Sequence, residues 1–187
     1  MPDLKILGIA GSLRQASYNR ALLREARSLV PPGVALEIYE GLEGIPPFNQ
    51  DLEGDGGPDV VRAFKAQVRD ADALLIATPE YNYGIPGVLK NAIDWLSRPA
   101  LQSPLRHKPI ALVGASGGAF GTVRSQLQLR QVLLFTDSRV LVKPEFYLPL
   151  AHQHFDAQGR LISEDVRTLL RAVVGALVDL ARERVPA

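Results

Sequence analysis

The sequence predicts an α/β fold in which a parallel β-sheet lies between two layers of helices. Two observations indicate it. Short apolar runs of strand length alternate along the chain with longer segments of helical periodicity. Several short runs, such as Ala73–Thr78, are apolar on both faces, as strands are when helices cover both sides of a sheet. The chain has 187 residues, so we expect residues 1–187 to form a single domain.

Strands and helices are expected in strict alternation. The five strands are Lys5–Ala10, Val34–Tyr39, Ala73–Thr78, Pro109–Ser116 and Arg139–Val142. The five helices are Asn19–Leu29, Pro58–Asp70, Pro86–Leu96, Gly121–Leu134 and Ser163–Glu183.

The last helix and one long connection allow more detailed predictions. Ser163, followed by two acidic residues, is expected to cap the last helix. That helix is then expected to bury an apolar stripe, made of Leu169, Leu170, Val173, Val174, Leu177 and Leu180. The connection Glu40–Gly57 is long for a compact domain, and we expect it to line a site.

Charge and cysteine content exclude several classes of function. Lys and Arg number 21 against 20 acidic residues, so nothing favours nucleic acid or an anionic membrane as a partner. No leader opens the chain and no run approaches the roughly 20 apolar residues of a spanning helix, so we expect a cytoplasmic protein. With no cysteine, redox chemistry would require a bound cofactor.

The loop Gly11–Asn19, GSLRQASYN, joins the first strand to the first helix and suits an anion. A helix N-terminus presents unpaired N–H groups and a partial positive charge, which favour a phosphate. Ser12, Ser17 and Asn19 would add short hydrogen-bonding side chains, and Arg14 a planar cationic fork.

A capping role is the alternative for this loop. Ser17 or Asn19 alone would as readily cap the helix, and Arg14 alone would be a solvated surface residue. Their clustering favours the phosphate. The loop has neither the GxxxxGK[ST] nor the GxGxxG pattern, so a mononucleotide is favoured over other nucleotides.

The segment Thr78–Pro99 follows the third strand, and its Pro and Gly residues predict a tight exposed loop before a helix. In a doubly wound sheet, ligands bind beyond the carboxyl ends of the strands where the strand order reverses. In the flavodoxin-like order 2-1-3-4-5, this point lies between strands 1 and 3. We therefore expect the loops after these two strands to share one ligand.

Three motifs in order, GSLRQASYN, PEYNYGIPGVLKNAIDW and GASGGAFGTVRSQLQLR, resemble the NADPH-dependent FMN reductase family, which includes chromate, quinone and azo-dye reductases. The likeness extends over nearly the whole chain, including Phe48–Glu53 and Phe155–Leu161. It implies a three-layer flavodoxin-like sandwich with a five-stranded parallel sheet of order 2-1-3-4-5 and helices on both faces.

The resemblance also implies a set of cofactor-binding residues. Ser12, Arg14, Ser17 and Asn19 would bind the FMN phosphate. Pro79, Glu80, Tyr81 and Asn82 would border the isoalloxazine and ribityl chain, and Ser116, Gly117 and Gly118 would flank the far side of the ring. Tyr83 and Gly84 vary within the family, so the resemblance assigns them no role.

Function follows from the same resemblance. The chain would transfer hydride from NADPH or NADH to bound FMN and then to a small acceptor, such as a flavin, quinone, azo dye or metal oxyanion, in a ping-pong cycle. Because the cofactor carries the chemistry, no catalytic residue is expected. The resemblance also implies a homodimer or homotetramer, with the helix around Ile85–Trp95 as a contact.

Several residues have simpler explanations. Tyr81 and Tyr83 could be amphipathic surface aromatics, and Glu80 a solvated carboxylate. We expect Trp95 to pack in the core or at a subunit interface and not to contact the flavin. Lys90 and Asp94 suit an i,i+4 ion pair.

Other chemistry is disfavoured. His152 and His154 lack a firm third ligand, so no metal site is expected. Ser116 lacks the GxSxG elbow of a hydrolase. A flavodoxin-type electron carrier is the main alternative, but the near-neutral charge and Arg14 favour a reductase. A flavin-free interaction module on the same fold is the second alternative. The physiological acceptor, the preferred nicotinamide, the tightness of FMN binding and the choice between dimer and tetramer stay open.

Overall fold

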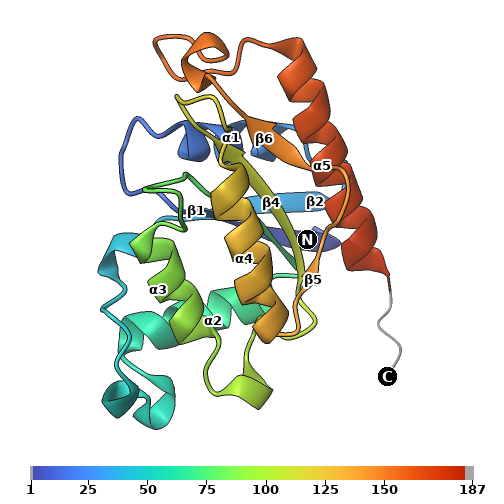
Figure 1. The fold of residues 1–187 in the computed structure, drawn as a ribbon. Coiled ribbons are helices and arrows are strands. Elements are labelled where there is room, and N and C mark those ends of the chain that lie inside the picture. Colours follow the sequence, from blue (N-terminus) through green and yellow to red (C-terminus); the bar gives the residue numbers. More distant parts are fainter. Residues whose placement is uncertain (1, 184–187) are drawn as a thin grey trace.

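The computed structural model describes residues 2–183, which form one parallel sheet covered by helices on both faces (Figure 1). The strands are β1 (Leu4–Ala10), β2 (Val34–Tyr39), β3 (Ala73–Ala77), β4 (Pro109–Ala115), β5 (Arg139–Val140) and β6 (Phe146–Leu148). Their order is β2-β1-β3-β4-β5, and β6 also pairs with β4. The predicted flavodoxin-like order 2-1-3-4-5 is confirmed.

The fifth position of the sheet differs from the prediction because two short strands share it. β5 pairs with Pro109 and Ile110 at the start of β4, whereas β6 pairs with residues 113–115 at its end. The expected strand Arg139–Val142 ends at Val140. Pro144 lies between the two strands and has no N–H to donate to a ladder, so one continuous strand is disfavoured here.

Within the described residues, five α-helices form the outer layers, and their ends lie within two residues of the predicted ones. They are α1 (Tyr18–Ser28), α2 (Asp59–Asp70), α3 (Gly87–Leu96), α4 (Val123–Phe135) and α5 (Glu164–Arg182). α1 and α5 pack on one face of the sheet, and α2, α3 and α4 on the other (Figure 1). Among the helices of the described residues, none is both long and apolar enough to cross a membrane.

α5 follows the predicted pattern with small differences. Ser163 occupies the cap position, but its hydroxyl makes no capping hydrogen bond. Leu169, which was expected in the buried stripe, is exposed, and Val178, which was not, is buried. The buried stripe therefore lies slightly to one side of the predicted one.

Residues of the central strands alternate between two cores. Leu74 and Ile76 of β3 pack toward α2, α3 and α4, whereas Leu75 and Ala77 pack toward α1 and α5. Burial on both faces explains why the strand is apolar throughout. The sheet is therefore a firm base for the loops at its carboxyl edge.

The long connection 40–57 contains three short 3₁₀ turns, Leu42–Gly44, Gln50–Leu52 and Gly54–Gly56. α3 holds it in place: Trp95 is fully buried and its Nε1 donates to the Pro46 carbonyl at 2.8 Å, and Asn91 Oδ1 accepts from Phe48 N at 2.7 Å. The structural role predicted for Trp95 is confirmed. The end of the connection is held by α2, whose Lys65 Nζ donates to Gly56 O at 2.9 Å, and its first residues border a cavity described below.

Candidate functional site

The first loop leaves β1 beside β3 and enters α1 through a capped turn. Gly11 N donates to Ala77 O at 2.9 Å, and a Cβ on Gly11 would lie 2.9 Å from a Leu89 methyl, so an added side chain would have to push that methyl aside. Ser17 Oγ accepts from the backbone N–H groups of Asn19 and Arg20 at 3.2 and 3.4 Å. The capping role considered for Ser17 is thus present in the structure.

A cavity of about 160 Å³ lies where the loops after β1, β3 and β4 meet. We call it the loop cavity. It is lined by Ser12, Arg14, Ser17, Tyr18, Asn19, Pro79, Glu80, Tyr81, Ala115, Ser116 and Gly117. Nine of the predicted cofactor-binding residues are among them.

The loop cavity is rich in donors suited to an anion. Within residues 2–183, the backbone N–H groups of Gln15, Ala16 and Tyr18 have no acceptor. Arg14 is exposed at the mouth, with its guanidinium 5.7 Å from the centre of the Tyr18 ring. Free N–H groups beside a helix N-terminus and an arginine suit a phosphate.

Asn19 lines the same cavity, but its side chain has other partners. Its Nδ2 donates to Ala115 O at 3.0 Å, and its Oδ1 accepts from Ala115 N at 2.9 Å. The residue is 3% exposed. Its side-chain amide therefore joins α1 to the end of β4, a contact that no motif in the sequence indicates.

The loop after β3 forms a tight hairpin. Tyr81 and Gly84 exchange backbone hydrogen bonds of 3.2 and 2.9 Å. Asn82 and Tyr83 between them have φ of 49° and 66°. A left-handed conformation is unusual for tyrosine and indicates a turn held by its surroundings. The Tyr81 hydroxyl lies 3.2 Å from Ser12 Oγ, which joins this hairpin to the first loop.

Glu80 does not direct its carboxylate into open solvent. Its oxygens accept from the backbone N–H groups of Arg124 and Ser125 at 3.0 and 3.3 Å, and from Arg124 Nε at 2.6 Å. Its side chain is 7% exposed. The solvated alternative for Glu80 is therefore wrong, because the carboxylate caps α4 and pairs with Arg124.

The loop after β4 is supported from β6. Ser116 N donates to Leu148 O at 3.0 Å, and Leu150 N donates to Gly118 O at 3.0 Å. A Cβ on Gly117 would meet no atom within 4 Å. This exposed glycine surface leaves room for a flat ligand to lie against the backbone.

A second cavity of about 300 Å³, the rim cavity, adjoins the loop cavity through Glu80 and Ser116. Its lining also contains Asn82, Tyr83, Gly118, Phe120, Thr122 and Arg124. The two cavities together contain all eleven residues of the predicted cofactor site. Arg124 and Phe120 were assigned no role from the sequence, although both lie in the third motif.

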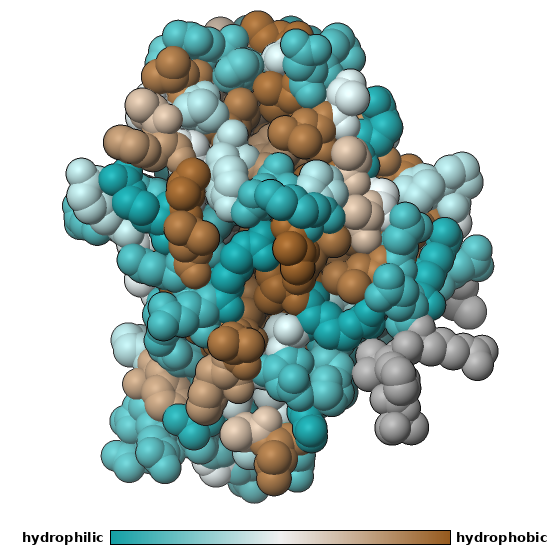
Figure 2. Space-filling view, turned by 45° about the vertical axis from the view of Figure 1, so that its right-hand side comes forward, coloured by the Kyte–Doolittle hydropathy of each residue, from teal (hydrophilic) through white to brown (hydrophobic). Residues whose placement is uncertain are grey.

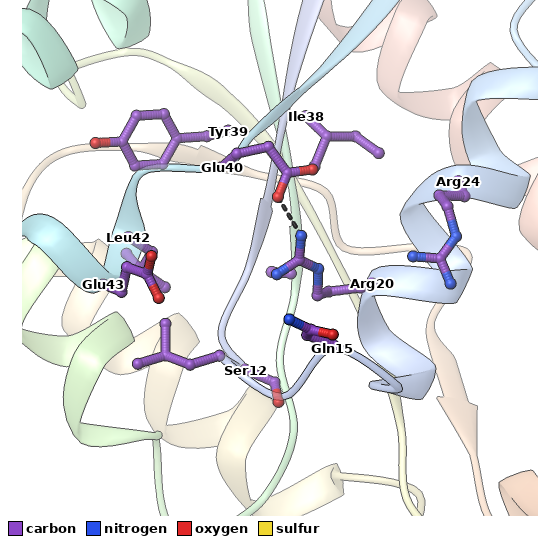
Figure 3. A pocket seen from close by; sticks show the side chains of 11 residues that line it. Ser12, Gln15, Arg20, Arg24, Ile38, Tyr39, Glu40, Leu42 and Glu43 are labelled. Atoms are coloured by element: carbon purple, nitrogen blue, oxygen red, sulfur yellow. Dashed lines mark hydrogen bonds and ion pairs between the residues drawn. The ribbon is translucent and has the colours of Figure 1, made fainter. Parts of the chain in front are cut away.

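A larger cavity of about 480 Å³ lies on the other side of the first loop, near the ends of β1 and β2 (Figure 3). Arg20 and Arg24 of α1 face it from one side and Glu40 and Glu43 from the other, with an Arg20–Glu40 ion pair across it. Burial raises the pKa of Tyr39 in its wall. Its opposite charges offset one another, and it lies away from the β1/β3 switch point. We therefore place the main site in the loop and rim cavities.

These residues fit FMN. The loop cavity offers free N–H donors, Ser12, Ser17 and Arg14 for a phosphate. The rim cavity offers glycine backbone and hydrogen-bonding groups for a planar polar ring. Elsewhere, Lys90 and Asp94 form the predicted ion pair at 2.7 Å. Within residues 2–183, no three His, Asp or Glu residues are grouped as a metal site requires.

Comparison with known proteins gives a consistent result. The family model described as NADPH-dependent FMN reductase matches residues 4–153. The chain is 53% identical over 175 residues to an NAD(P)H-dependent FMN reductase of Pseudomonas aeruginosa, covering 94% of each chain. It is 42% identical to a 2-hydroxy-1,4-benzoquinone reductase of a Burkholderia species, covering 97% of this chain and 98% of the relative.

A solved structure is also similar. FerB, a flavoenzyme NAD(P)H:(acceptor) oxidoreductase from Paracoccus denitrificans, superposes with a TM-score of 0.86 at 32% identity. The match covers 95% of this chain and 97% of that one.

Proposed function

We propose the function of this chain from the premise that it belongs to the NADPH-dependent FMN reductase family, over residues 4–153 and beyond. The chain is an FMN-dependent NAD(P)H oxidoreductase. Bound FMN supplies hydride chemistry, accepting two electrons from a nicotinamide and passing them to a flavin or quinone acceptor. Azo dyes and metal oxyanions are further acceptors that an open ring face admits.

One observation carries the proposal: the loops after β1, β3 and β4 are joined by side-chain bonds around two adjoining cavities, which share Glu80 and Ser116. Ser12 bonds to Tyr81, Asn19 to Ala115, and Glu80 to Arg124. These links pre-organise the donors, so little ordering is needed when the ligand binds.

Each part of the site has a distinct task in this proposal. Ser12, Arg14, Ser17 and the free N–H groups of the first loop bind the phosphate. The backbone of Pro79–Asn82 holds the ring and ribityl chain, and residues 116–118 flank the ring. Asn19 acts by holding the end of β4 in place. No side chain is required as an acid or base, because the protein's task is to position two planar partners.

The donor and the acceptor would use the same exposed ring face in turn, which gives ping-pong kinetics. The reductase is tested by loading purified protein with FMN and adding NADPH or NADH without oxygen. The flavin colour should bleach and return on addition of a quinone, and initial rates should give parallel double-reciprocal lines. A coloured protein that neither nicotinamide bleaches would favour the electron carrier, and a protein that binds no FMN would contradict both readings.

We also propose that the chain acts as a single FMN-binding domain in the cytoplasm and assembles as a homodimer or homotetramer. The continuous sheet supports one domain, and the lack of cysteine is compatible with a reducing compartment.

The surface favours α4 over α3 for the assembly contact. The α3 residues Leu89, Ile93 and Trp95 are buried within the chain. On α4, Leu127, Leu134 and Phe135 are 54%, 78% and 72% exposed, and the space-filling view shows hydrophobic surface between hydrophilic residues (Figure 2). Leu127 and Leu134 are two turns apart on the same side of α4, and exposed apolar side chains so placed are typical of an interface.

A further inference from the structure

Arg124 lies against two exposed aromatic rings at the rim cavity. Its guanidinium carbon is 3.6 Å from the centre of the Tyr83 ring and 4.3 Å from that of Phe120. The two aromatic residues come from different loops and are 66% and 61% exposed. Stacking of a guanidinium on aromatic faces is favourable and holds flexible side chains in one arrangement. We call these three residues the cation–aromatic platform.

Glu80 fixes one edge of the guanidinium. Nε and Nη2 of Arg124 lie 2.6 and 2.5 Å from Glu80 Oε1. Within the described part of the chain, Nη1 of Arg124 has no hydrogen-bond partner. The Arg124 side chain is 31% exposed and Glu80 lies behind it. The planar fork is thus held by one edge, which leaves its other edge available to a ligand.

The charge balance around the rim cavity favours an anion. The negative charge of Glu80 is offset by Arg124 and also by the two N–H groups at the N-terminus of α4. The remaining lining residues, Asn82, Tyr83, Ser116, Gly118, Phe120 and Thr122, carry no charge. The formal charges of the lining cancel, but Arg124 is 31% exposed and Glu80 only 7%, so the charged group that reaches the mouth of this cavity is the guanidinium.

We propose that Arg124 is a specificity-determining residue, which favours acceptors with an anionic group on a planar ring over uncharged acceptors of the same shape. The ring would pack on Tyr83 or Phe120, and the anionic oxygen would accept from Nη1. This inference rests on the proposed function, because it places the reducible acceptor beside the flavin ring in the rim cavity.

The test uses the FMN-loaded protein, reduced photochemically beforehand so that no nicotinamide is involved. It is mixed anaerobically with 1,4-naphthoquinone or with 1,4-naphthoquinone-2-sulfonate, and the second-order rate constant is measured for each. The ratio of the two constants is compared between wild type and Arg124→Gln, so that the different potentials of the quinones cancel. Arg27→Gln is the matched control, because it removes an exposed positive charge from a different helix, α1.

We expect Arg124→Gln to lower the sulfonate-to-quinone ratio roughly tenfold, the low end for loss of a charge-assisted hydrogen bond, and Arg27→Gln to leave it unchanged. Phe120→Leu, which spares the ion pair, should slow both quinones by a similar factor. Calorimetric titration with naphthalene-2-sulfonate, which is not reduced, should show the same roughly tenfold loss of affinity in Arg124→Gln.

An unchanged ratio and unchanged sulfonate affinity in Arg124→Gln would overturn the inference. If Arg124→Gln loses FMN, Arg124→Lys is tested in its place, because an ammonium cannot bind both Glu80 and the ligand as the planar guanidinium does. A fall of the sulfonate-to-quinone ratio by about threefold or more in Arg124→Lys supports the inference, and an unchanged ratio overturns it. If neither quinone oxidises the reduced, FMN-loaded wild-type protein, the proposed function is overturned, and the inference with it.

Discussion

The side-chain amide of Asn19 forms a two-point bond with the main chain of Ala115, at 3.0 Å through Nδ2 and 2.9 Å through Oδ1. The two residues are 96 positions apart and both are buried. This bond fixes the first turn of α1 against the end of β4. It therefore sets the spacing between the loop that would bind the phosphate and the loop that would flank the ring.

Asn19→Ala should consequently weaken FMN and riboflavin by the same factor. The change leaves the N–H and C=O of Ala115 unpaired in a buried position, which costs about 1–3 kcal/mol per group in stability. Fluorescence titration of both flavins and urea unfolding measure the two effects. A loss confined to FMN would instead make Asn19 a phosphate ligand.

Arg14→Ala, by contrast, should weaken the binding of FMN and not that of riboflavin. A charge-assisted hydrogen bond to phosphate is worth about 1.5–3 kcal/mol, so FMN affinity should fall at least about tenfold while riboflavin affinity is kept. Arg27→Ala is the control and should change neither affinity, because Arg27 is exposed like Arg14 but lies in α1, outside the loop. Equal losses for the two flavins on replacing Arg14 would refute its assignment to the phosphate.

The sequence predicted the layers and strand order because burial on both faces makes each central strand apolar throughout. All eleven residues expected to bind the cofactor are among those that line the two cavities. The sequence did not predict what their side chains bond to: Asn19 bonds to β4 and Glu80 to α4, and these partners are set by the packing of distant segments. Arg124 was missed for the same reason, since its guanidinium bonds to Glu80, 44 residues earlier in the chain.

Leu134→Glu should convert the proposed oligomer to a monomer. Leu134 is 78% exposed on the apolar face of α4, and a carboxylate there would have to be desolvated at a contact. Leu101→Glu is the control, because Leu101 is 82% exposed in the turn Ala100–Gln102, outside α4. Light scattering after gel filtration measures the mass; an unchanged mass for Leu134→Glu would place the contact elsewhere.

Asp156 should make stability depend on pH in the acid range. Backbone donation from Arg160, at 2.9 Å, is the main cause that lowers the pKa of this carboxyl. Because the pKa is lower in the folded state than in the unfolded one, the stabilisation is full above the unfolded value of about 3.9 and is lost as pH falls through the folded value.

Asp156→Asn should therefore melt lower than wild type near neutral pH, and the difference should shrink below about pH 4. Asp179→Asn, whose carboxylate has no hydrogen bond within the described residues, is the control. Thermal melts at several pH values measure the effect. A difference that persists unchanged at the lowest pH would mean that the charge of Asp156 contributes nothing to stability.

Gly114→Ala should damage the base of the site. A Cβ on Gly114 would lie 1.9 Å from Thr122 Oγ1 and 2.6 Å from Thr78 O, so β4 would have to move away from α4. Overpacking of this kind costs about 1–3 kcal/mol or more, and flavin affinity should fall with stability because the loop after β4 moves too. Gly175→Ala on α5, where a Cβ meets no atom within 4 Å, should instead stabilise the protein by up to about 1 kcal/mol. Urea unfolding measures the free energy of unfolding of both variants. If Gly114→Ala were as stable as Gly175→Ala, Thr122 would not pack closely against Gly114 as described.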